Sequence, residues 1–137
     1  MEWCSEDIIK LAVALLAGAM IGAEREYRSK SAGFRTLMLI SFGSALFTML
    51  SSKIGQSDEA RIAANIVTGI GFLGAGVIIR DSTGIQIFGL TTAATIWCAA
   101  GLGIACGMGY WRFVLLSVGI ILLVLVTGGP LEKFVAR

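Results

Sequence analysis

Long apolar segments separated by short charged connections dominate this sequence. The apolar segments cover residues 8–23, 36–52, 62–79, 88–108 and 111–127. Each approaches or reaches the roughly 17 to 25 residues with which a helix crosses the hydrocarbon core of a bilayer. The pattern predicts an all-α, polytopic membrane protein. We expect five transmembrane helices in a compact, Gly-rich bundle that forms a single domain over residues 1–137.

The composition supports a membrane protein and argues against several other classes. Of 137 residues, 56% are hydrophobic and 15% are charged, which is more apolar than a soluble domain of this size. The chain contains no His, which removes the commonest general base and transition-metal ligand at neutral pH. The three cysteines form no CxxC pair, and we expect them to be buried thiols. A net charge of +2 is too small to indicate a nucleic-acid partner.

Basic residues are distributed unevenly among the connections, which predicts an orientation. With the N-terminus outside, the cytoplasmic side holds Arg25, Arg28, Lys30, Arg35, Arg80, Lys133 and Arg137, and the outer side holds Lys53, Arg61 and Arg112. Lys and Arg are in excess on the cytoplasmic side of membrane proteins. We therefore expect the N-terminus outside and the C-terminus in the cytoplasm.

The segment NIVTGIGFLGAGVIIRD, residues 65–81, places glycines in an apolar run. On a helical wheel, one face is small and polar: Asn65, Thr68, Gly69, Phe72 and Gly76, flanked by Gly71 and Ala75. Ile66, Ile70, Leu73 and Val77 form the opposite face. Membrane helices associate through small residues that let their backbones approach. We expect Gly69, Gly71, Gly74 and Gly76 to pack against other helices, as well as Gly18 and Gly22 in the first span.

Hydroxyl side chains follow two other spans. They are Ser41, Ser44 and Thr48 in the second span, and Thr91, Thr92 and Thr95 in the fourth. One interpretation is that these hydroxyls bond to their own helix or to a neighbour and serve only assembly. The other is that, with Asn65 and Thr68, they surround a polar cavity that admits an ion or a small solute. The sequence leaves both interpretations open.

The charged connection after the first span contains Glu24 and Arg25, and Glu24 has the spacing of a helical ion pair with Arg28. Ionised groups at the membrane boundary need solvent or a partner. We expect a contact of Glu24 with Arg35 or with Arg80. Asp81 is a second carboxylate that would complete a Mg²⁺ site with Glu24 if the arginines paired elsewhere. The alternative is that the basic side chains only fix the orientation of this loop.

Four motifs resemble the membrane domain of the MgtC/SapB family. They are GAERE at residues 22–26, AGFRT at 32–36, GIGFLGAGVIIRD at 69–81 and GLTTAATIW at 89–97. Carried over motif by motif, the characteristic positions include Glu24, Arg25, Arg35, Thr36 and Trp97. The resemblance implies a multi-pass protein of the bacterial inner membrane. Longer members continue into a soluble cytoplasmic domain, so this sequence is either a short form of the family or the membrane part of a longer protein.

The resemblance also implies a physiological setting, which is growth in low magnesium and virulence. Family members are described as acting through other membrane proteins. Our leading hypothesis is therefore a non-enzymatic membrane protein that self-associates, most simply as a dimer, and binds other membrane proteins. The rival hypothesis is a small transporter or channel for a cation or small solute, with a hydroxyl-lined pathway. No nucleophile and base pair supports an enzyme. We expect no cofactor, and the sequence leaves an association with Mg²⁺ open.

Overall fold

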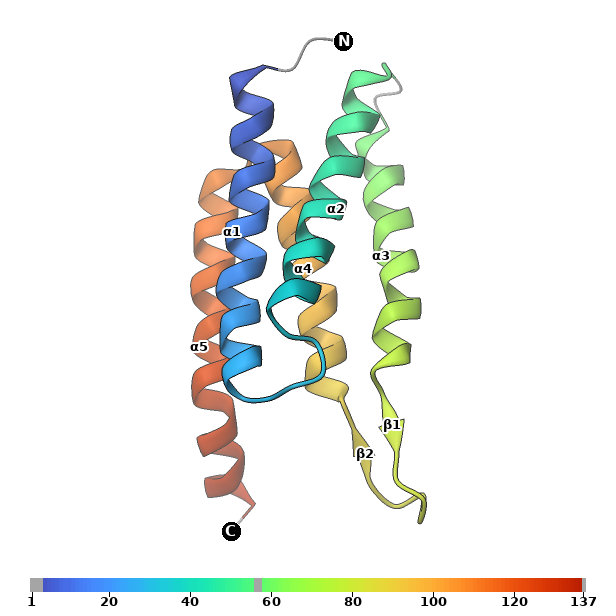
Figure 1. Cartoon of the computed structure of the whole chain (residues 1–137), viewed down its shortest axis with the longest axis vertical. Coiled ribbons are helices and arrows are strands. Elements are labelled where there is room, and N and C mark those ends of the chain that lie inside the picture. The colour runs from blue at the N-terminus through green and yellow to red at the C-terminus, as the bar shows by residue number, and fades with distance from the viewer. Residues whose placement is uncertain (1–3, 56–57, 137) are drawn as a thin grey trace.

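The computed structural model describes residues 4–55 and 58–136, and these residues are mostly helical. The helices in this part of the chain are α1 (Ser5–Tyr27), α2 (Phe34–Lys53), α3 (Glu59–Gly76), α4 (Leu90–Met108) and α5 (Trp111–Val135), and Figure 1 shows their arrangement. Two short strands, β1 (Ile79–Arg80) and β2 (Ile87–Phe88), pair antiparallel between α3 and α4. The predicted all-α character and the five helical segments are confirmed.

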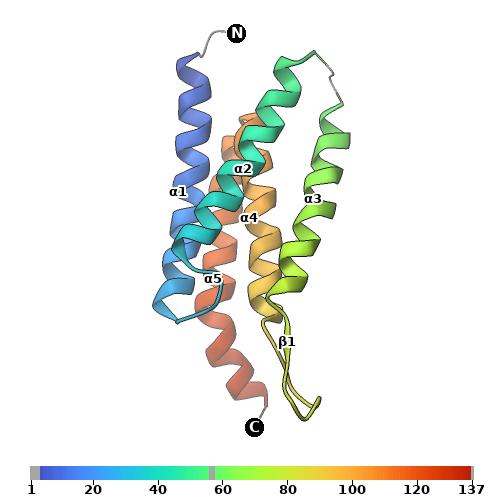
Figure 2. The same cartoon turned by 45° about the vertical axis from the view of Figure 1, so that its right-hand side comes forward.

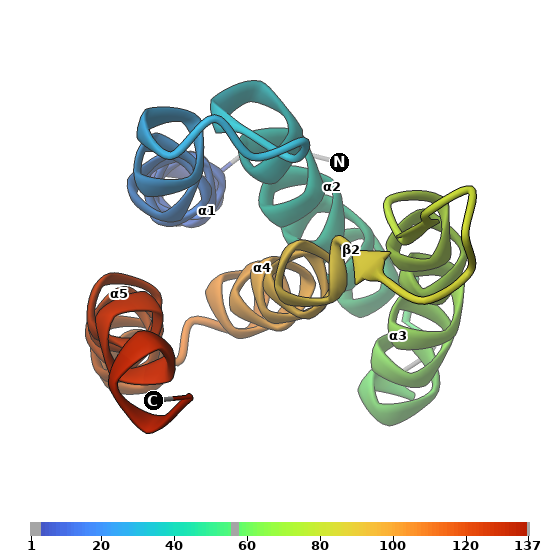
Figure 3. The same cartoon turned by 90° about the horizontal axis from the view of Figure 1, so that it is seen from below.

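The bundle is built around α2 and α4. Helix α2 packs against α1 on one side and α4 on the other, and α5 contacts α1 and α4. Helix α3 packs chiefly on α4. Figure 3 shows α4 in the middle, with α5 and α3 on opposite sides of it. Figure 2 shows that α2 and α3, which follow one another in the chain, diverge from their connection downwards.

Two pairs of glycines allow the central helices to touch. A Cβ atom on Gly18 of α1 would lie 2.5 Å from the carbonyl oxygen of Leu37, and one on Gly22 would lie 2.8 Å from the Cα atom of Phe34, both in α2. On α4, Gly103 meets the carbonyl oxygen of Ser41 in the same way. Gly107 follows four residues later and also lies against α2. Such close approach of backbones is how small residues stabilise helix pairs in membranes.

Three of the helices, α2, α4 and α5, are long and apolar enough to cross a membrane. Helix α1 carries more charge within its bounds, including Lys10 and Glu24, and the shorter α3 includes Glu59, Arg61 and Asn65. Large apolar side chains also lie on the outside of the bundle: Leu115 is 76% exposed and Phe47 is 60% exposed. An apolar exterior of this kind is suited to lipid rather than to water.

Several segment ends differ from the sequence prediction, and α1 extends beyond residues 8–23 at both ends. The third span was expected to continue to residue 79, but α3 ends at Gly76 and the chain enters the β1–β2 hairpin. The hairpin is closed by a hydrogen bond from the Asp81 N–H to the Gln86 carbonyl at 2.9 Å. The last span was expected to end at residue 127, but α5 continues to Val135 with Pro130 inside the helix.

Candidate functional site

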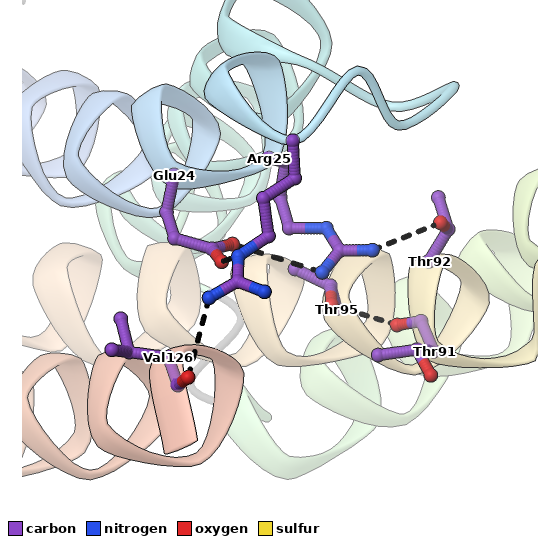
Figure 4. A network of polar contacts seen from close by, with 7 residues as sticks. Glu24, Arg25, Thr91, Thr92, Thr95 and Val126 are labelled. Atoms are coloured by element: carbon purple, nitrogen blue, oxygen red, sulfur yellow. Dashed lines mark hydrogen bonds and ion pairs between the residues drawn. The ribbon is translucent and has the colours of Figure 1, made fainter. Parts of the chain in front are cut away.

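A buried cluster of charged and hydroxyl groups lies where α1, α4 and α5 meet, near the α1–α2 connection (Figure 4). Its acidic member is Glu24, in the last turns of α1, whose side chain is only 9% exposed. An Nη atom of Arg25 lies 3.7 Å from one carboxylate oxygen of Glu24. Nε of Arg28 lies 2.5 Å from the other carboxylate oxygen. The predicted helical pair of Glu24 with Arg28 is therefore confirmed, and one carboxylate serves two guanidinium groups.

Arg25 connects this cluster to α4. Its side chain is 4% exposed, and its Nη2 atom donates a hydrogen bond to Oγ1 of Thr92 at 3.3 Å. The Arg25 Nε–H is buried and has no hydrogen-bond acceptor among the described residues. Burying a charge is costly unless it is paired, so the contacts with Glu24 and Thr92 fix the angle between the end of α1 and the start of α4.

Arg28 connects the same cluster to α5. Its Nη2 atom donates to the carbonyl oxygen of Val126 at 3.2 Å. In an α-helix that oxygen accepts from the N–H four residues later. The residue four positions later is Pro130, which has no N–H to donate. Arg28 therefore supplies the hydrogen bond that Pro130 cannot make.

The other charged residues expected at this site lie elsewhere. Arg35, Thr36 and Arg80 are exposed, and the expected contact of Glu24 with Arg35 or Arg80 is wrong. Among the described residues, Arg25 and Arg28, on the same helix as Glu24, are the basic side chains within ion-pair distance of its carboxylate, and neither carboxylate oxygen accepts a hydrogen bond from the described residues.

Asp81 belongs to the β1–β2 hairpin rather than to the cluster. Its carboxylate accepts hydrogen bonds from the Thr83 hydroxyl at 2.7 Å and the Ser82 hydroxyl at 3.2 Å. These bonds, that from Thr83 foremost, lower the pKa of Asp81 below its ordinary value. Among the described residues, no group of three or more His, Cys, Asp or Glu side chains comes together as a metal site would require.

The hydroxyl groups singled out in the sequence are divided between two environments. Ser41, Ser44, Thr92 and Thr95 are buried, whereas Thr91 and Thr68 are exposed. Several close on their own helix: Thr95 donates to the Thr91 carbonyl at 2.7 Å and Thr68 to the Ala64 carbonyl at 2.9 Å. The buried serines Ser41 and Ser44 face α4 at Gly103.

The large aliphatic face of α3 is the one that packs inside the described chain. The wheel separates the two faces correctly, and Ile66, Ile70 and Val77 pack against the core. A Cβ atom on Gly69, Gly71 or Gly76 would meet no heavy atom within 4 Å, so the packing of these three glycines against other helices stays a prediction. Gly74 is buried, and a Cβ atom there would lie 3.8 Å from that of Ala93. Helix α3 packs chiefly on α4 and leans away from α2 (Figure 2).

That divergence leaves an open groove of about 850 Å³ between α2 and α3. Its walls are mostly aliphatic and aromatic. Leu39, Phe47 and Leu50 line it from α2, and Ile62, Ile66, Ile70 and Leu73 line it from α3. The polar residues at the groove are Ser44, Ser51, Arg61 and Asn65. Of the predicted polar face, only Ser44 and Asn65 therefore reach this space.

Sequence reasoning missed three contributors to these contacts. Gly103 and Gly107 form a GxxxG pair in α4, the spacing typical of close membrane helix contacts, and this signal was available. The contact of Arg28 with Val126 could not be predicted. Pro130 shows that the Val126 carbonyl lacks its helical donor, but the sequence does not show which side chain reaches that carbonyl.

Comparison with known proteins assigns the chain to a family. The sequence profile of the MgtC family matches residues 11–134. The chain belongs to the MgtC family. It is 50% identical over 115 residues to the protein named Protein MgtC of Salmonella typhimurium (strain LT2), which covers 84% of this chain and 49% of that protein. It is also 50% identical over 100 residues to Protein MgtC of Brucella abortus (strain 2308), covering 72% and 41% of the two chains.

A further relative is the protein slr0014 of Synechocystis sp.. It is 40% identical over 136 residues, which are 98% of this chain and 57% of that protein. The chain thus spans about half the length of the curated relatives it matches. No solved structure matches it. Two features of this MgtC-family chain go beyond the packing of helices. They are the Glu24–Arg25–Arg28 cluster and the groove between α2 and α3.

Proposed function

We propose that this chain is a non-enzymatic protein of the bacterial inner membrane that acts by binding other membrane proteins, including a second copy of itself. All five helices cross the bilayer in this proposal. Its physiological setting is growth under magnesium limitation and virulence. Membership of the MgtC family and the apolar helices α2, α4 and α5 support the membrane assignment.

The observation that carries the proposal is the outward face of α3. Ala64, Thr68, Gly71 and Ala75 follow one another at spacings of a helical face, and all four are exposed. Lipid gives no hydrophobic reward for packing helices together, so membrane helices associate where small residues let backbones approach. Nothing of the described chain covers this face. A partner helix against it would gain the close contact that the glycines allow.

The distribution of basic residues supports an outside N-terminus and a cytoplasmic C-terminus. The α1–α2 connection, the hairpin and the end of α5 all lie at the lower end in Figure 1. These segments contain Lys30, Arg80 and Lys133, and a basic end of this kind faces the cytoplasm in bacterial membrane proteins. Arg137, which belongs to the same predicted set, lies outside the described residues.

The test is growth in low magnesium of a bacterial strain that lacks its own MgtC-type protein and receives this chain. Gly71→Leu fills the outward face without an internal clash, because a Cβ atom there meets no atom within 4 Å. We expect this variant to reach the membrane in normal amounts and to fail to restore growth. Gly119→Leu, at an equally open glycine of α5, is the matched control and should restore it. Full growth with Gly71→Leu would refute the proposal.

A further inference from the structure

The groove between α2 and α3 has a graded polarity along its length. Arg61 lies in the first turn of α3, near the connection to α2, and lines one end of the groove. Asn65 lines it one turn further along the helix, and beyond that the α3 wall is Ile66, Gly69, Ile70 and Leu73. At 1.5 Å per residue, Asn65 lies about 6 Å below Arg61 and Leu73 about 18 Å below it.

Asn65 needs a hydrogen-bond partner in this position. No hydrogen bond joins its side-chain amide to another described residue, although the walls around it are largely apolar. A polar group in the apolar part of a membrane is costly without a partner. Its amide can donate two hydrogen bonds and accept others. The groove therefore calls for an occupant that offers an acceptor one helical turn below the arginine.

Arg61 adds charge complementarity at the open end. Its side chain is 60% exposed and its Nε atom lies 3.7 Å from a carboxylate oxygen of Asp58. A guanidinium group has five N–H donors in a planar fork. At this exposure, a phosphate group can approach the positive charge of Arg61 while the contact with Asp58 is kept.

We propose that this groove binds one phospholipid of the outer leaflet. The phosphate contacts Arg61, an ester carbonyl accepts from the Asn65 amide, and an acyl chain lies along Ile66, Ile70 and Leu73. This order of phosphate, ester and hydrocarbon is the order found along a phospholipid. The groove length of about 18 Å along α3 also matches one leaflet, since half of a hydrocarbon core of about 30 Å is about 15 Å.

Two glycines give the acyl chain its room. Gly43 on α2 and Gly69 on α3 both line the groove, and a Cβ atom on either would meet no atom within 4 Å. The lipid site is separate from the outward face of α3, where Gly71 lies. It rests on the proposed function in that α3 crosses the bilayer with its first turn at the outer side.

The test is native mass spectrometry of the full chain, purified from bacterial membranes in mild detergent. We expect the wild-type chain to retain one phospholipid. Gly69→Leu fills the groove and should lose it, whereas Gly71→Leu, two residues along the same helix and absent from the groove lining, should retain it. Arg61→Gln should lower the retained fraction of phosphatidylglycerol roughly fivefold, the effect expected of one basic residue at a lipid surface.

Several results would overturn the lipid site. They are a wild-type chain without bound lipid, equal retention by Gly69→Leu and wild type, unchanged retention by Arg61→Gln, or equal loss in Gly71→Leu. A second copy of the chain held in place of lipid and lost in Gly69→Leu would also do so. Far-UV circular dichroism of each variant checks that the helices are intact. Because lipid retention is measured on purified protein, its failure is distinguishable from a failure to support growth.

Discussion

The hydrogen bond from Arg28 to Val126 should be needed only because Pro130 is present. Replacing Arg28 by Leu keeps an aliphatic side chain at this position. It removes the guanidinium that donates to the Val126 carbonyl, 3.2 Å away. Hydrogen bonds between membrane helices contribute about 0.6 kcal/mol on average and up to about 1.7 kcal/mol. Loss of the ion pair with Glu24 adds about 0.3 to 0.5 kcal/mol. We expect Arg28→Leu to lower the unfolding free energy by about 1 to 2 kcal/mol.

Pro130→Ala separates these two contributions. Alanine restores the N–H that the Val126 carbonyl lacks, so Arg28→Leu in the Pro130→Ala background should lose only the ion-pair part, about 0.3 to 0.5 kcal/mol. The assay is unfolding in mixed micelles by increasing SDS, followed by far-UV circular dichroism, for the two single variants and the double variant. Lys30→Leu, an exposed basic position nearby, is the control and should change little. Additivity of the two substitutions within about 0.3 kcal/mol would refute the reasoning.

Two further predictions concern the contacts of α2. Gly103→Leu should destabilise the bundle by about 3 kcal/mol or prevent folding, because its side chain would clash with the backbone of α2. The control Gly101→Leu has open space around its Cβ atom and should fold normally. Equal melting temperatures of the two variants would contradict this packing. Asp7 pairs with Lys53 at 2.6 Å, and the hydrogen bond from Lys53 is the main cause that lowers the pKa of Asp7 below its ordinary 3.8. A carboxylate whose pKa is lowered in the folded state stabilises the protein at pH values above its unfolded-state pKa. The melting temperature should therefore fall as the pH drops below about 4, and it should fall less in Lys53→Gln. The same fall in both proteins would contradict the Asp7–Lys53 pair.

The sequence was sufficient for the positions of the helices but not for the orientation of α3. Hydrophobic length located all five segments, because helices alone satisfy the backbone over such apolar runs. The wheel also divided α3 into its two faces. In water, an apolar face would point inwards, but in lipid either face can meet a neighbour. In the structure, Ile66 and Ile70 face the core and Gly71 faces outwards. This orientation depends on how α3 packs against α4, which the sequence of α3 alone does not show.

The candidate charged site was predictable in part. The GAERE motif identified Glu24 and Arg25, and the spacing of four residues identified Arg28 as a partner. The connections to Thr92 and to α5 depend on which helices are neighbours, and local spacing carries no such information. The β1–β2 hairpin was missed because Ile78 and Ile79 continue the apolar run of α3 without a break in the pattern.

Cysteine cross-linking in native membranes tests the central claim most directly, namely that the outward face of α3 meets another membrane protein. Gly71→Cys and Gly69→Cys are introduced separately after Cys4, Cys98 and Cys106 are replaced. The account predicts that oxidation links Gly71→Cys to a second copy, while Gly69→Cys, which faces the groove, stays uncross-linked. Absence of any cross-link from Gly71→Cys, or equal cross-linking from both positions, would contradict it.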